Sequence, residues 1–242
     1  MKRRDVVSAL TMGSLIFTAN KTFAQFGGLK SLTDRAKGTS SSDSQSSSGS
    51  VSSWKEAAEL FSDAKNEFAK SVSKLANISA DIADALDLKS EAETLRGEAK
   101  NLSSKGDAMG SSDLDTISEN SSATNALIDE KLKAAEALSD DQKASLGKAA
   151  VDYVPLMIST IGVAMKVKDT VSGVTSLGSP GFSDGRAAIS AAREIPSLGP
   201  NMIRFTADST KTGVSLLNLM NTKGVSTPDT SDLDSQLGDL MS

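Results

Sequence analysis

Apolar residues recur at helical spacing between residues 54 and 86, and this pattern predicts one long amphipathic helix. Nine steps between consecutive apolar positions cover 32 residues, an average of about 3.6, which is the period of an α-helix. Ser53 stands just before the pattern and Glu56 three residues later, the spacing of a capping box. The apolar positions are Trp54, Ala58, Phe61, Ala64, Phe68, Val72, Leu75, Ile78, Ile82 and Leu86.

The rest of the chain predicts further helices separated by turns, without the alternation that strands require. A polar run at 118–122 leaves open a break in the helix that contains it. Pro196 is expected to end one helix, and Gly199-Pro200 to begin the last. We therefore expect an all-α fold, an elongated bundle of four to six helices over residues 54–225. The additional helices are expected at about 90–104, 112–138, 139–177, 183–195 and 200–224.

The helix expected at 139–177 is the most apolar part of the chain after its N-terminal segment. Tyr153 to Met165 is a run of 13 residues without a charge. This run makes ~20 Å of helix against ~30 Å of hydrocarbon in a bilayer, and Pro155 is expected to kink it. We favour a central core helix surrounded by the others; the alternative is a membrane-active segment that leaves the bundle after a trigger. The candidate residues for either role are Val151, Val154, Leu156, Met157, Ile158, Ile161 and Val163.

The first 24 residues have the pattern of a signal peptide. Basic residues at 2–4 precede an apolar stretch at 6–17, and small residues allow cleavage after Ala24. We therefore expect a periplasmic or secreted protein; the paired arginines leave open general or twin-arginine export. Residues 25–53 are rich in Gly and Ser, and we expect a disordered linker there.

The acidic C-terminal tail, residues 226–242, carries apolar residues that share one helical face. Such a face fits the groove of a partner protein. Docking on the protein's own bundle and disorder remain as alternatives. The residues of this candidate docking face are Leu233, Leu237, Leu240 and Met241.

The composition excludes several kinds of catalytic and metal site, because the chain contains neither histidine nor cysteine. It therefore has no imidazole or thiol for the usual nucleophile systems or for an ordinary zinc site. Cleavage after Ala24 removes four of the 26 basic and one of the 31 acidic residues, leaving 22 and 30 and a net charge of −8. Such a protein repels phosphate backbones, so we expect no nucleic-acid partner.

The remaining motifs have simpler explanations than catalysis. Ser71 with Lys74, and Ser145 with Lys148, have a nucleophile–base spacing, but a solvated helix face accounts for both pairs. Bundle di-metal sites use Glu-x-x-His pairs, which this chain lacks. We expect no catalytic residue, no cofactor and no metal site, and hence a protein that is not an enzyme.

The segment Ala83-Asp84-Ala85-Leu86-Asp87-Leu88-Lys89-Ser90-Glu91-Ala92-Glu93 resembles a segment in an uncharacterised family of exported, mostly helical proteins of Gram-negative bacteria. The order of the chain is also similar to that family: signal, Phe-Gly-Gly-Leu start, Gly/Ser linker, long helix, bend, apolar helix. The resemblance implies export and a helical bundle, and it carries over no functional residue.

Three functions are compatible with these features. The leading hypothesis is a non-enzymatic exported protein that acts by protein–protein interaction or self-assembly, or as a structural component of the envelope or extracellular space. The main alternative is a membrane-active protein similar to helical pore-forming toxins. A carrier that holds an apolar ligand between its alanine-rich helices is the third.

Overall fold

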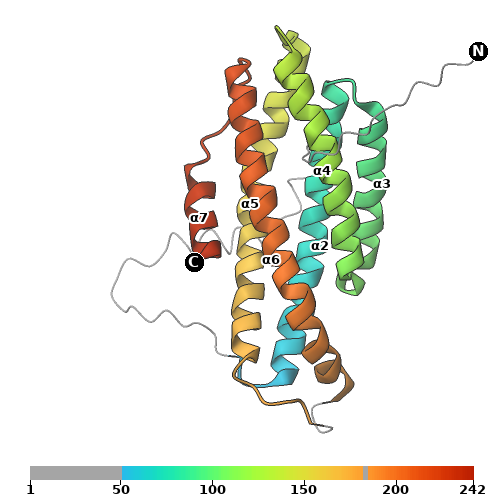
Figure 1. The fold of residues 1–242 in the computed structure, drawn as a ribbon, viewed down its shortest axis with the longest axis vertical. Helices are drawn as coiled ribbons and strands as arrows, with labels where there is room; N and C mark the ends of the chain where they lie inside the picture. The colour runs from blue at the N-terminus through green and yellow to red at the C-terminus, as the bar shows by residue number, and fades with distance from the viewer. Residues whose placement is uncertain (1–50, 182–184) are drawn as a thin grey trace, which may run out of the picture.

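The computed structural model describes residues 51–181 and 185–242, and these residues form six α-helices with no strand among them (Figure 1). The predicted all-α, elongated bundle is confirmed. The predicted leader, and the predicted linker up to residue 50, lie outside the described residues. The elements are α2 (Trp54–Ala85), α3 (Lys89–Lys105), the 3₁₀ turn η2 (Gly106–Ala108), α4 (Ser111–Ala134), α5 (Asp140–Val174), α6 (Gly185–Thr222) and α7 (Ser231–Met241).

Helix α2 lies at the centre of the bundle and contacts α3, α4, α5 and α6. Its start follows the predicted cap, because the Ser53 Oγ accepts a hydrogen bond from the Glu56 amide at 3.3 Å. Its end is the predicted turn, in which Asp87 adopts a φ of 61° and the Leu88 amide donates to the Ala83 carbonyl at 2.8 Å. Asp tolerates this left-handed conformation better than most residues.

Helix α5 is not the fully surrounded core helix that its composition predicts. It contacts α2, α6 and α7 and leaves one side in solvent. Val151, Pro155 and Gly162 are exposed on that side. The error arises because absence of charge does not require burial when the residues are small or only moderately apolar.

Helix α6 corrects a second expectation, since it runs unbroken through Pro196 and Pro200. The two prolines lie one turn apart and both are exposed, so water can hydrate the carbonyls that lose their amide donors. The Ser197 Oγ also donates to the carbonyls of Arg193 and Glu194, at 3.2 and 3.0 Å. Burial of the opposite side holds the helix together across the prolines.

The core consists of two apolar clusters stacked along the bundle. Helices α4, α5 and α6 place buried polar side chains, Asn125, Thr160 and Thr206, near the junction of the clusters. The two threonines donate to carbonyls one turn earlier in their own helices, each at 2.9 Å. Within the described residues, the Asn125 amide and the Ser121 hydroxyl are buried without a partner.

Helix α4 is continuous through the polar run where the sequence left a break open. Ile117 and Ile128 are buried on either side of that run, one in each apolar cluster. The anchored ends keep the polar middle helical.

Close approach of helices depends on glycine at two positions in α6. A methyl group at Gly213 would lie 1.7 Å from the Tyr153 hydroxyl oxygen, and one at Gly199 would lie 2.5 Å from a Val171 methyl. The buried Tyr153 hydroxyl donates to the Ser209 carbonyl at 3.1 Å, and burial raises the pKa of this phenol.

The last residues of the predicted linker pack against the bundle instead of leaving it. Val51 is 5% exposed and lies against Gly173, where a methyl group would meet it at 2.8 Å. The Trp54 indole N–H donates to the Gly178 carbonyl. Order therefore begins at least two residues before the predicted boundary.

We expect Gly213→Ala to destabilise the protein by about 1–3 kcal/mol, because the methyl group overlaps the Tyr153 ring. Gly162→Ala is the matched control: this helical glycine is exposed and has nothing near its missing Cβ. That control should be stabilised by up to about 1 kcal/mol through helix propensity. Urea unfolding followed by circular dichroism measures both, and equal effects would contradict the tight contact.

We expect Asn125→Leu to stabilise the protein by about 1–3 kcal/mol. Leucine branches at Cγ as asparagine does, so two methyl groups replace the two unpaired buried polar atoms. Asn218→Leu, at an exposed position of α6, isolates the gain in helix propensity, about 0.7 kcal/mol at most. Thermal and urea unfolding would compare the two variants. A loss of stability in the buried variant would show that the amide is hydrated or paired in solution.

Candidate functional site

The seven candidate residues of α5 divide between the core and the surface. Val154, Met157, Ile161 and Val163 are buried, Leu156 and Ile158 are half-buried, and Val151 is 58% exposed. Of the helices that the structure describes, only α5 is long and apolar enough to cross a membrane, and half of its apolar window is buried inside the bundle. Most of the candidate segment therefore faces other helices.

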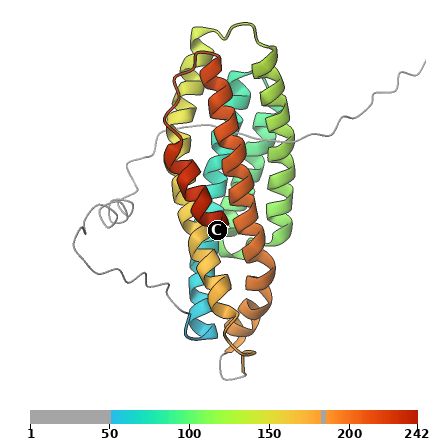
Figure 2. The ribbon, with the colours of Figure 1, turned by 60° about the vertical axis from the view of Figure 1, so that its left-hand side comes forward.

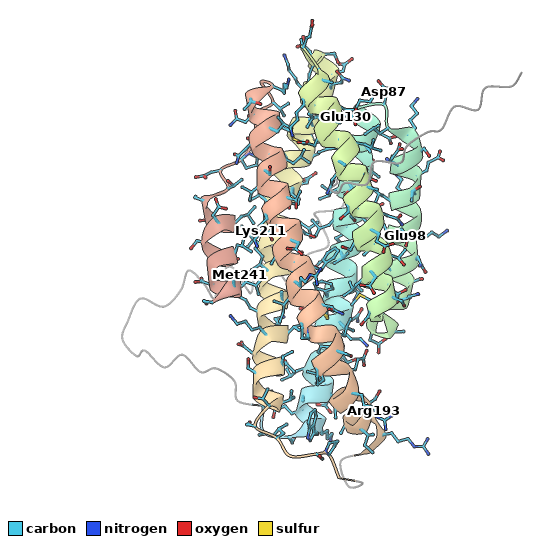
Figure 3. The ribbon with its side chains drawn as sticks, in the orientation of Figure 1. Asp87, Glu98, Glu130, Arg193, Lys211 and Met241 are labelled. Atoms are coloured by element: carbon cyan, nitrogen blue, oxygen red, sulfur yellow. The ribbon has the colours of Figure 1, made fainter. Side chains whose placement is uncertain are left out.

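The acidic tail forms helix α7, which lies along α5 and α6 (Figure 2). Leu233 and Leu240 are buried and Leu237 is half-buried, whereas Met241 is 57% exposed at the free end of the helix (Figure 3). Three of the four predicted docking residues thus pack on the protein's own bundle. This is one of the alternatives that the sequence leaves open.

The structure brings the two predicted sets together on one surface, the α5–α7 face. Leu233 and Leu240 belong to the same apolar cluster as Val154, Met157 and Ile161. The chain reaches this position through a turn at Gly224, with a φ of 77°, and through the buried Val225 beside Gly147. Val163 belongs to the other cluster and Val151 to neither, so the α5–α7 face joins only part of the two predicted sets.

Sequence reasoning missed Lys168, which holds the end of α7. Its Nζ donates to the carbonyls of Asp239 and Leu240, both at 3.2 Å. A cation there also stabilises the negative end of the helix dipole. No spacing in the sequence connects a lysine of α5 with carbonyls 71 and 72 residues later.

A second surface feature is a polar groove of about 320 Å³ between α2 and α3, the α2–α3 groove. Two hydrogen bonds fix its floor. The Ser73 Oγ donates to the Ala99 carbonyl at 2.7 Å, and the Asn77 Nδ2 donates to the Ser73 carbonyl at 3.0 Å. The polar lining does not suit the apolar ligand of the carrier hypothesis. The lining residues are Ser73, Asn77, Arg96, Ala99, Lys100, Ser103 and Ser104.

One lining residue, Arg96, forms two ion pairs. Arg96 Nη2 is 2.6 Å from Asp84 Oδ2 and also pairs with Asp81. Burial raises the pKa of Asp81, and the charge and hydrogen bond of Arg96 oppose that rise. Burial also lowers the pKa of Lys74, and the positive charge of Lys70 lowers it further.

The two Ser-x-x-Lys motifs differ in their exposure. Ser71 is buried on α2, whereas Ser145 and Lys148 are exposed on α5. Across residues 51–181 and 185–242, no group of three or more acidic side chains is placed to hold a metal ion.

Comparisons with protein-family models, curated proteins and solved structures found no match. The function is therefore inferred from the two surfaces themselves.

We expect Leu233→Ala to release α7 from the bundle, because it removes a fully buried side chain at a cost of about 2–5 kcal/mol. Hydrogen exchange should then become faster in α7 and in the part of α5 beneath it. Met241→Ala is the control, since its exposed side chain predicts a change within about 0.5 kcal/mol. Equal exchange in both variants would contradict the docked position of α7.

Proposed function

We propose that this chain is an exported, non-enzymatic helical-bundle protein that acts by protein–protein interaction, or as a structural component of the envelope or extracellular space. The proposal rests on the α5–α7 face. There the bundle accepts an amphipathic helix through leucines at 233, 237 and 240, the spacing by which helices dock into apolar grooves.

Two exposed apolar side chains lie on the two helices that form this face. Val151 on α5 and Met241 on α7 are each more than half exposed. A partner that covers them gains apolar burial without any rearrangement of the core. Export is supported by the basic, apolar and small-residue pattern of residues 1–24.

In-cell cross-linking with fractionation of the same culture tests this proposal. We expect the protein outside the cytosol, with the mass of a chain cleaved after Ala24, cross-linked to a partner or to itself. Val151→Asp should reduce the cross-link several-fold, because it places a charge on the exposed apolar face. Ala123→Asp, at an exposed position of α4, is the matched control and should leave it unchanged.

Two outcomes of this experiment would contradict the proposal. An uncleaved chain in the cytosol would show that the protein is not exported. Equal cross-linking in both variants would show that the α5–α7 face does not take part in the interaction.

The second candidate function is membrane activity, which the length and apolar character of α5 favour. Dye release from liposomes by the folded protein, lost in Val151→Asp and kept in Ala123→Asp, would support it over the first. Ile161→Asp tests the core role, because a buried, unpaired carboxylate costs at least several kcal/mol. Loss of folding in that variant, with no leakage from the native protein, would exclude the membrane-active alternative.

A further inference from the structure

The α2–α3 groove collects cations and hydroxyl groups on a protein whose net charge is negative. The charged side chains that line it, Arg96 and Lys100, are both basic. Serine hydroxyls and an asparagine amide supply the remaining polar groups. A groove with this lining offers hydrogen-bond donors together with positive charge, the combination that oxyanions require.

Three acids of α2 have cationic partners. Glu67 pairs with Lys166 of α5 at 2.8 Å, and Asp81 and Asp84 both pair with Arg96. Two aspartates face the single guanidinium of Arg96, whereas Lys100 forms no ion pair within the described residues and supplies the unpaired positive charge of the lining.

Lys70 adds a further positive charge beside the groove. It is exposed on α2, three residues before Ser73 and seven before Asn77, a spacing that places the three on adjoining turns of one side of the helix. Its field reaches its neighbours, since it lowers the pKa of Lys74. Lys70 therefore lies on α2 one turn before the lining residue Ser73, and Lys100 lines the groove from α3.

Arg96 is held in position by the two aspartates through a single nitrogen, Nη2. A guanidinium has five N–H donors in a fixed plane, so Arg96, which lines the groove, has more donors than the aspartates use. Its orientation is set before any ligand arrives, which lowers the entropic cost of binding.

We propose that the α2–α3 groove binds a small phosphate or sulfate ester of a hydroxylated compound. Lys100 and Lys70 supply the charge, Arg96 a fixed donor, and Asn77, Ser103 and Ser104 the hydrogen-bonding partners for hydroxyl groups. A volume of about 320 Å³ lies at the lower end of the range for small-molecule sites, which suits a molecule of the size of one sugar phosphate. The site uses different residues from the α5–α7 face, so either proposal can fail alone.

Calorimetry and amide chemical shifts with glucose 6-phosphate, inorganic phosphate and glucose as probes test this site on the folded chain. We expect saturable binding of the ester, with a Kd of about 1 mM or below. Shifts should centre on residues 70–77 and 96–104. Glucose should not bind, and phosphate should bind more weakly than the ester.

Two variants locate the site, and a third serves as control. Lys100→Glu should weaken ester binding by about tenfold or more. Ser103→Leu should also weaken binding, because it fills the groove without changing its charge. Lys211→Glu, on the exposed side of α6, makes the same charge change away from the groove and should leave binding intact (Figure 3).

Three results would overturn the proposal. The first is absence of saturable binding by both the ester and inorganic phosphate. The second is equal weakening by Lys211→Glu and Lys100→Glu, which would indicate a response to net charge alone. The third is binding to phosphatidylglycerol vesicles without binding of the soluble ester, which would indicate a membrane surface contact instead of a groove ligand.

Discussion

Every part of this bundle depends on the burial of α2 by four other helices. Its apolar stripe is built largely from alanines, including Ala57, Ala64, Ala76, Ala80 and Ala83, which let neighbouring backbones approach closely. Phe61 and Phe68 are the largest buried side chains of this stripe. With few aromatic residues and no disulfide, stability comes from this dense contact and not from covalent bridges. The α2–α3 groove exists because the same contact stops short of the solvent edge of both helices.

The polar groups in the core are unevenly satisfied. The hydroxyls of Thr160 and Thr206 donate to carbonyls of their own helices, so they need no hydrogen-bond partner from a neighbouring helix. Asn125 makes no such bond, and its helix, α4, also has a long polar middle. Asn125 therefore weakens the packing of α4, because an unpaired buried amide carries its full desolvation cost.

The sequence predicts the helices well because periodicity and caps are local signals. Ser53 accepts the predicted hydrogen bond at the start of α2. Prediction from the sequence fails where the structure depends on which side of a helix is exposed to solvent. Pro196 and Pro200 were expected to break α6, and their exposure makes them tolerable. The central place of α2 was also missed, because periodicity shows that a face is buried but not how many helices bury it.

The two candidate surfaces were predictable to different degrees. The leucines of α7 and the apolar residues of α5 were both identified, but their mutual contact depends on a turn at Gly224 that no periodicity reveals. The groove was not predicted at all. Its residues recur at intervals of three or four on either side of the turn at Asp87, and that spacing was its only signal in the sequence.

The short connection between α6 and α7 has a thermodynamic consequence. Residues 223–230 tether α7 to its seat, so a detached α7 stays close to it at an effective concentration in the millimolar range for a short flexible tether. A foreign helix that competes for this seat must overcome that advantage before it gains any occupancy. Weak or scarce competitors are thereby excluded, and only an abundant partner or one of high intrinsic affinity displaces the chain's own C-terminus.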